Sequence, residues 1–140
     1  MITAIDSSVL FDVILNDPKY CSPSLASLQR ANSEGSLIVC PVVWAELRAA
    51  LKAPETIAYV LNNANIAFDP FDQKCTDLAG DLWCKYRRNG GKRSQLIPDF
   101  LVGAHAQIRA DRILTRDRGF LRRYFNPLVV IEPISVPDAH

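Results

Sequence analysis

The sequence has no long apolar run and no leader-like start. No stretch of its 140 residues approaches the ~18 consecutive apolar residues that a membrane span needs. The first residues, MITAIDSSVLFDVIL, have no basic residue before the apolar stretch and no small-residue cleavage site, so they do not resemble a secretion signal. We therefore expect a cytoplasmic protein with no membrane partner.

The four cysteines lack the spacing of a metal site. Cys21, Cys40, Cys75 and Cys84 form neither a CxxC nor a CxxH pair, and those short spacings are typical of zinc ligands. The sequence favours four reduced, mostly packed thiols over a zinc site or a disulfide framework. We assign them no function.

The chain also lacks a linker rich in Pro, Gly or Ser. Hydrophobic residues make up 49% of the composition, which is enough for a real core in a chain of this length. We therefore expect a single domain over residues 1–140.

No side chain is placed as a catalytic nucleophile. The sequence contains no GxSxG motif and no papain-like cysteine setting. The one interior histidine, His105, follows Asp99 by six residues in a predicted helix. That spacing puts it ~240° around the helix axis, away from the carboxylate. Nucleophilic catalysis by the protein therefore has little support, and we interpret His105 as structural.

Short β-branched runs alternate with helical patterns, which is typical of a parallel α/β sheet. The predicted strands are Ile2–Ile5, Leu37–Val39, Ile66–Phe68, Arg112–Thr115 and Leu128–Ile131. The predicted helices are Val9–Leu15, Leu25–Ala31, Pro41–Lys52, Pro54–Leu61, Asp72–Arg88, Pro98–Ala110 and a short one through Leu121 to Tyr124. In such sheets, ligands bind at the carboxyl ends of the strands.

Three aspartates fall where strands end or helices begin. Asp6 follows the first strand, Asp99 opens a helix, and Asp117 follows the fourth strand. The helix after Asp99 descends ~20 Å and the next strand climbs most of the way back, so Asp99 and Asp117 return to one edge. Each aspartate taken alone is equally a helix cap, although Ser7 or Ser8 can cap the first helix and leave Asp6 free.

The fourth acid, Glu46, is oddly placed on its helix. On the helical wheel it falls between Val42 and Ala50, nearly opposite the polar residues Arg48 and Lys52. We therefore expect its carboxylate to point inward. A buried acid needs a cation, hydrogen bonds or a metal, and the alternative to a metal here is a salt bridge to an inward-reaching arginine.

Four carboxylates at one sheet edge cannot all ionise without compensation. Hard divalent cations that prefer oxygen ligands, Mg²⁺ or Mn²⁺, supply it. The chemistry that this suits is hydrolysis of a phosphodiester bond by a metal-activated water. The predicted catalytic and metal-binding residues are therefore Asp6, Glu46, Asp99 and Asp117.

The four acids are not equivalent in this prediction. Asp6 and Asp99 are expected to bind the metal directly, while Glu46 and Asp117 bind it directly or through water. The hydroxyls of Ser8 and Thr115, which lie close to these acids in the chain or the sheet, are expected to orient them by hydrogen bonds.

Positive charge is concentrated in one segment. Residues Lys85 to Arg123 hold eleven of the sixteen Lys and Arg but three of the fifteen Asp and Glu, a net charge of +8 against −7 for the remainder. This asymmetry favours a polyanion such as RNA along one side of the molecule, although a solvated helix face is the alternative. The predicted RNA contacts are Arg93, Arg116 and Arg118.

Four motifs in order resemble the PIN-domain ribonucleases, and more closely the VapC-type toxins of prokaryotic toxin–antitoxin pairs. They are AIDSSVL, WAEL, IPDFLVGAHA and ILTRDRGF, and the similarity continues to RRYFNPLVVIEP. Ser7 stands where threonine is commoner in the family. The resemblance implies a three-layer α/β/α sandwich with a central five-stranded parallel sheet. It also implies Mg²⁺- or Mn²⁺-dependent cleavage of RNA that leaves a 5′-phosphate, a homodimer, and inhibition by a cognate antitoxin.

Other classes fit less well. A haloacid-dehalogenase-type phosphatase needs a second Asp at the position of Ser8, and a receiver domain needs an acidic pair and a late lysine that the chain does not offer. A PIN nuclease that processes RNA without an antitoxin, or a non-cleaving RNA-binding PIN-like scaffold, stays open as an alternative.

The early helices carry surplus apolar residues. The segments Val9–Leu15, Leu25–Ala31 and Ile57–Leu61 hold more of them than one small sheet face can cover. This predicts a groove for an amphipathic antitoxin segment. Completion of the core or of a dimer interface explains the same surplus.

Overall fold

Five parallel strands form the centre of the fold. The computed structural model describes residues 1–91, 97–117 and 119–133 of the chain. The strand order is β3-β2-β1-β4-β5. The bounds are β1 Ile2–Ile5, β2 Ser36–Val39, β3 Ile66–Phe68, β4 Arg112–Leu114 and β5 Val129–Ile131. This confirms the expected five-stranded parallel sheet.

Strand β1 lies in the middle and pairs with a strand on each side. Its residue Ala4 is in register with Ile38 of β2 and with Ile113 of β4. The chain first adds strands on one side of β1 and then returns to add β4 and β5 on the other. The order therefore reverses between β1 and β4, and such a switch point is where open α/β sheets bind ligands.

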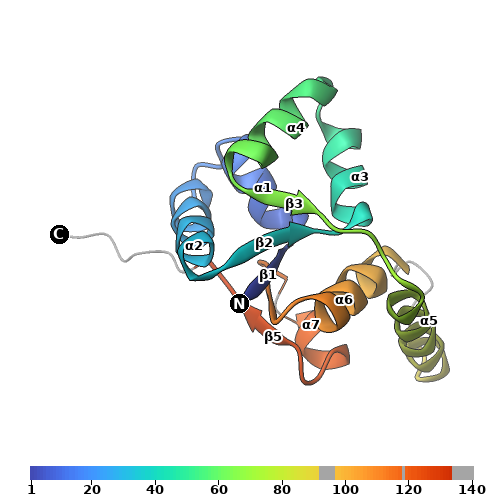
Figure 1. Cartoon of the computed structure of the whole chain (residues 1–140). Helices are drawn as coiled ribbons and strands as arrows, with labels where there is room; N and C mark the ends of the chain where they lie inside the picture. The colour runs from blue at the N-terminus through green and yellow to red at the C-terminus, as the bar shows by residue number, and fades with distance from the viewer. Residues whose placement is uncertain (92–96, 118, 134–140) are drawn as a thin grey trace.

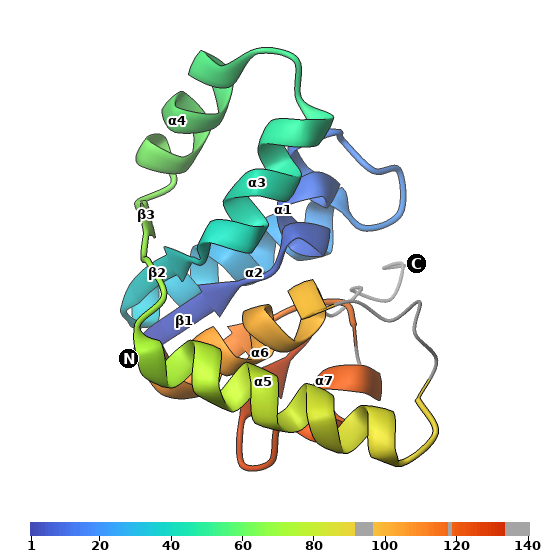
Figure 2. The same ribbon diagram turned by 90° about the vertical axis from the view of Figure 1, so that its right-hand side faces the viewer.

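Seven helices in the described residues connect and cover the sheet. They are α1 Ser7–Ile14, α2 Cys21–Glu34, α3 Pro41–Ala50, α4 Pro54–Asn63, α5 Gln73–Arg88, α6 Ile97–Arg109 and α7 Gly119–Tyr124. Helices α1 to α4 lie on one side of the sheet and α5 to α7 on the other (Figures 1 and 2). This is the three-layer sandwich, and right-handed crossovers produce it because the direction of strand addition changes once.

Local sequence explains where the helices begin. Helices α3 and α4 each start at a proline, whose missing N–H is not needed in the first turn. Asp72 caps α5 by accepting a hydrogen bond of 2.9 Å from the backbone N–H of Cys75. The predicted elements agree with the observed ones to within a few residues at their ends.

Large apolar side chains from both faces fill the core. Among the fully buried ones are Ile5, Leu37, Leu47, Phe100 and Ile113. Helix α6 packs closely here, because a Cβ built at Gly103 would collide with the buried ring of Phe125. In the described part of the chain, no helix is long and apolar enough to cross a membrane.

The cysteines are all free thiols, without a disulfide. Cys40 and Cys75 are buried as expected, but Cys84 is exposed on α5. Burial raises the pKa of Cys40 to about 11, so that thiol stays protonated and unreactive near neutral pH.

Candidate metal centre

The four predicted acids lie around the switch point of the sheet. Asp6 directly follows β1, and Asp117 follows the end of β4, the neighbouring strand. Asp99 sits in the first turn of α6 and Glu46 in α3. In Figure 2 the start of α6 lies beside the tip of the β1 arrow.

Asp6 is held by three hydrogen bonds. Its Oδ1 accepts from the backbone N–H of Ser7 at 2.8 Å, which makes Asp6 the N-cap of α1. Its Oδ2 accepts from the hydroxyls of Thr115 at 2.6 Å and Ser8 at 3.2 Å. The expectation that a serine would cap α1 and leave Asp6 free is therefore wrong. The side chain of Asp6 caps the helix and receives both predicted hydroxyls.

The Thr115 hydroxyl also connects two of the acids. It is fully buried, donates to Asp6, and accepts a hydrogen bond of 2.9 Å from the backbone N–H of Asp117. The backbone N–H of Arg116 donates to the Ser8 hydroxyl at 3.2 Å. The loop after β4 is thereby fixed against the start of α1.

Glu46 does not point into the core. The residue is exposed, and the buried residues of α3 are Val43 and Leu47. The buried face of α3 is therefore centred on Val43 and Leu47 and not on the face between Val42 and Ala50. Glu46 lies beside this buried face. Its Oε2 accepts a hydrogen bond of 3.3 Å from the Ser7 hydroxyl, a contact that sequence reasoning missed. Within the described chain, no cation pairs with it, so the arginine alternative finds no support.

The four carboxylates influence one another electrostatically. Partial burial, then repulsion from Asp6 and finally from Asp99 raise the pKa of Glu46. The pKa of Asp99 is raised by partial burial first, then by Asp117 and Asp6. The pKa of Asp117 is also raised, mainly by desolvation and further by Asp6, although the N–H groups of Phe120 and Gly119 oppose the shift.

This donor set fits a hard divalent cation in its chemistry. It consists of carboxylate oxygens whose mutual repulsion a cation would relieve. Across residues 1–91, 97–117 and 119–133, however, no group of three acidic, histidine or cysteine side chains already forms a metal site.

One predicted RNA contact is already engaged within the protein. Arg116 donates through Nε and Nη2 to the buried carboxylate of Asp12, at 2.8 Å each. Its guanidinium lies 4.1 Å from the centre of the Tyr20 ring, and Asp12 also accepts from Ser24 at 2.6 Å. Arg93 and Arg118 lie outside the described residues.

Sequence reasoning missed Asp12, although a signal was present. Asp12 lies three residues after the buried Val9 in an apolar helix, so it is an acid on the helix face that packs inward. The same criterion that singled out Glu46 would have found it.

His105 lies in a separate cluster. It is buried, its Nε2 is 2.9 Å from Oδ2 of Asp69, and Asp69 also forms a bidentate pair with Arg109. Desolvation lowers the pKa of His105 even though Asp69 opposes the shift. These contacts support the structural interpretation of this histidine.

Fold and site together define an α/β protein with acidic side chains gathered at the carboxyl-terminal edge of a parallel sheet. Residues 3–126 match the family model of the PIN domain, and the chain belongs to that family. PIN domains are nucleases, and they generally use divalent metals. A search of the curated proteins found no match.

Several solved structures have the same fold. VapBC2 from Rickettsia felis, bound to a DNA fragment from its promoter, is 20% identical with a TM-score of 0.74, and the match covers 94% of this chain and 98% of that one. DNA-bound VapBC from Salmonella typhimurium is 15% identical with a TM-score of 0.71, covering 96% and 99%. FitAcB from Neisseria gonorrhoeae is 20% identical with a TM-score of 0.66, covering 95% and 98%. At these identities the similarity establishes the fold.

Proposed function

We propose that this protein is a Mg²⁺- or Mn²⁺-dependent endoribonuclease that acts as the toxin of a toxin–antitoxin pair. The observation that carries the proposal is the set of four mutually repelling carboxylates at the switch point of a PIN-family sheet. Three of them have a raised pKa, partly through one another. Full ionisation of such a group of carboxylates is unfavourable without a bound cation and becomes favourable with one.

The chain's own residues divide the work. Asp6 and Asp99 would hold the metal directly, with Glu46 and Asp117 binding it directly or through water. A bound Mg²⁺ supplies a water of lowered pKa and charge neutralisation at the scissile phosphate. Thr115 and Ser8 keep the Asp6 carboxylate in one orientation through their hydroxyls.

We assign the predicted phosphate contacts unequally. Arg116 already donates bidentate hydrogen bonds to Asp12, so its role in the proposal is to fix the loop that carries Asp117. Arg93 and Arg118 remain the proposed phosphate contacts. Single-stranded or looped RNA is the proposed substrate, because one exposed phosphate must reach the edge of the sheet.

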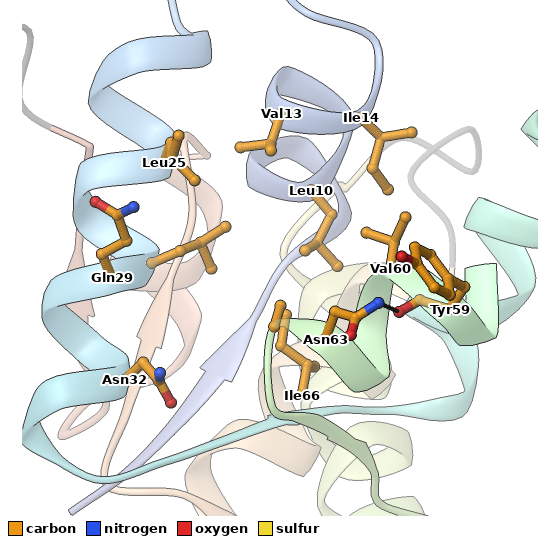
Figure 3. A pocket seen from close by; sticks show the side chains of 12 residues that line it. Leu10, Val13, Ile14, Leu25, Gln29, Asn32, Tyr59, Val60, Asn63 and Ile66 are labelled. Carbon is orange, nitrogen blue, oxygen red and sulfur yellow. Dashed lines mark hydrogen bonds between the residues drawn. The ribbon is translucent and has the colours of Figure 1, made fainter. Parts of the chain in front are cut away.

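The proposed antitoxin site is a groove between α1, α2 and α4. It has a volume of about 430 Å³ (Figure 3). Apolar side chains dominate its lining: Leu10, Val13, Ile14, Leu25, Leu28, Tyr59, Val60, Ala64 and Ile66. Tyr59 is 71% exposed and Leu25 is 41% exposed, so the groove suits the apolar face of an amphipathic helix. The solved VapBC complexes of similar fold support this choice of partner, and a homodimer in the cytoplasm is part of the same proposal.

The test is a cleavage assay with the purified chain. We expect Mg²⁺ or Mn²⁺ to support cutting of single-stranded RNA, EDTA to abolish it, and mapped ends to carry a 5′-phosphate. RNA binding without cleavage at any metal concentration would favour the non-cleaving scaffold. Cleavage without growth arrest on expression would favour an RNA-processing nuclease that has no antitoxin.

A further inference from the structure

A second hollow lies between the end of α5 and α7. Its volume is about 580 Å³, and in Figure 2 helix α7 lies beside the last turns of α5. The residues that line it are Tyr86, Asn89, Gly90, Gly91, Gly119, Phe120, Arg123 and Tyr124. Nothing in the proposed metal chemistry or in the antitoxin groove uses this hollow.

Aromatic rings form a fixed wall of the hollow. The centre of the Phe120 ring is 5.1 Å from that of Tyr124, and the Tyr124 ring is 5.5 Å from that of Tyr86. Behind them, Phe100 is fully buried and lies 4.8 Å from Phe120. Tilted and edge-to-face contacts of this kind hold ring orientations, so the wall exists before any ligand binds.

Cations surround the aromatic wall. Arg123 lies 5.5 Å from the centre of the Tyr124 ring. Arg87 and Arg88 line an adjoining hollow of about 500 Å³, which shares Gly91 with the first. Within the described residues, none of these three arginines forms an ion pair with a carboxylate. Aromatic rings flanked by cations suit a ligand that is planar and also carries phosphates.

The hollow lies next to one acid of the candidate metal centre. Gly119 and Phe120 line it, and their backbone N–H groups also donate hydrogen bonds to Asp117. A nucleotide with its phosphate at the carboxylates thus has a neighbouring base within reach of the aromatic wall.

We infer that this hollow binds one unpaired nucleobase of a single-stranded RNA, next to the phosphate that the carboxylate cluster cleaves. The base stacks against the aromatic wall, while the Asn89 carboxamide offers a donor and an acceptor to its edge. Arg87, Arg88 and Arg123 contact the flanking phosphates. The inference rests on the proposed ribonuclease function and adds a specificity-determining subsite to it.

Two glycines provide a matched test. A Cβ at Gly119 or at Gly80 would meet no heavy atom within 4 Å, so both positions accept a side chain. Gly119→Leu places that side chain at the hollow, whereas Gly80→Leu places it on the exposed surface of α5. The probes are a fluorescein-labelled single-stranded RNA of about twelve nucleotides and an abasic ribose-phosphate chain of equal length, both measured by anisotropy in EDTA.

We expect wild type and Gly80→Leu to bind the RNA about tenfold more tightly than the abasic chain, which is the scale of one stacked base. Gly119→Leu should lose that preference and still bind the abasic chain like wild type. Equal affinity of wild type for both probes overturns the inference, as does a preference that survives in Gly119→Leu. Failure of the wild type to bind or cut RNA, with Mg²⁺ supplied, refutes the ribonuclease proposal itself, and the subsite falls with it.

Discussion

Asp6 is the acid on which the cluster depends most. After desolvation, which is the largest cause, its charge helps to raise the pKa of Glu46, Asp99 and Asp117. Its Oδ2 accepts a hydrogen bond from the buried Thr115 hydroxyl. That hydroxyl also accepts from the backbone N–H of Asp117, so it fixes both the Asp6 carboxylate and the backbone that carries Asp117.

Thr115→Val should therefore damage both stability and activity. The substitution keeps the side-chain shape but leaves the N–H of Asp117 without its acceptor, at a cost of about 1–3 kcal/mol. We expect a further loss of about 10–100-fold in cleavage, the usual effect of removing a partner that orients a metal ligand. Denaturant melts and RNA cleavage rates measure the two effects. Thr115→Ser, which retains the hydroxyl, is the control, and equal damage from both variants would contradict the argument.

Asp99→Asn should abolish cleavage and preserve the fold. The pKa of Asp99 is raised by desolvation and by its acidic neighbours, so its ionised form is unfavourable in the folded chain. The metal-free variant should consequently melt no lower than wild type. Thermal melts in EDTA and cleavage assays in Mg²⁺ test this, with the exposed Asp81→Asn on α5 as the control. A variant that keeps EDTA-sensitive cleavage would remove Asp99 from the site.

The raised pKa values also predict how stability depends on pH. An acid whose pKa is higher in the folded state binds protons more tightly when folded, so its contribution to stability falls as pH rises from the unfolded to the folded pKa. Acids with a lowered pKa, such as Asp69 and Asp72, produce the opposite slope. We therefore compare wild type with Asp99→Asn/Asp117→Asn in EDTA. The double variant should gain stability relative to wild type as pH increases from about 4 to 7. A difference in the free energy of unfolding that stays constant over this range would contradict the raised pKa values.

At the scale of elements, the Asp12–Arg116 pair joins α1 to the loop after β4. Asp12 is 2% exposed, whereas the Arg116 side chain is 34% exposed. Removing the arginine leaves a buried carboxylate with Ser24 as its remaining partner. This pair therefore contributes to the position of Asp117 without being part of the acid cluster.

Arg116→Gln should destabilise the protein by about 2–3 kcal/mol. This is below the ~3–5 kcal/mol for breaking a fully buried pair, because solvent screens the partly exposed guanidinium. The comparison is Arg30→Gln, which disrupts an i,i+4 pair whose arginine is 80% exposed and should change stability by less than about 0.5 kcal/mol. Urea unfolding measures both. Similar values for the two variants would show that the buried pair has no special structural role.

The elements themselves followed from local signals in the sequence. The prolines that open α3 and α4 and the alternation of apolar runs predicted their places closely. The site was harder, because contacts between distant segments decide it. Neither the Ser7–Glu46 hydrogen bond nor the Asp12–Arg116 pair can be derived from sequence spacing. A small error in the predicted orientation of α3 was enough to make the prediction for Glu46, an inward-pointing carboxylate, wrong.

At the scale of the whole molecule, the apolar groove and the carboxylate cluster lie on different parts of the surface. Helices α1, α2 and α4 form the groove on one side of the sheet (Figures 1 and 3), while the acids occupy the carboxyl edge. Partner binding and RNA cleavage should therefore respond to separate substitutions.

Leu25→Asp should prevent capture of the antitoxin and leave RNA cleavage intact. Leu25 lines the groove and is 41% exposed, so an aspartate there is tolerated by the fold but disfavours an apolar partner. Leu15→Asp is the matched control, because Leu15 is 61% exposed and does not line the groove. Each variant is co-expressed with any small protein that is encoded beside the gene, and the complex is purified through that protein. Loss of the complex with Leu25→Asp alone, with toxicity restored, supports the groove. If Leu25→Asp still forms the complex, the partner binds elsewhere. If the wild-type enzyme is active and no partner is recovered with it, an antitoxin-free nuclease is favoured.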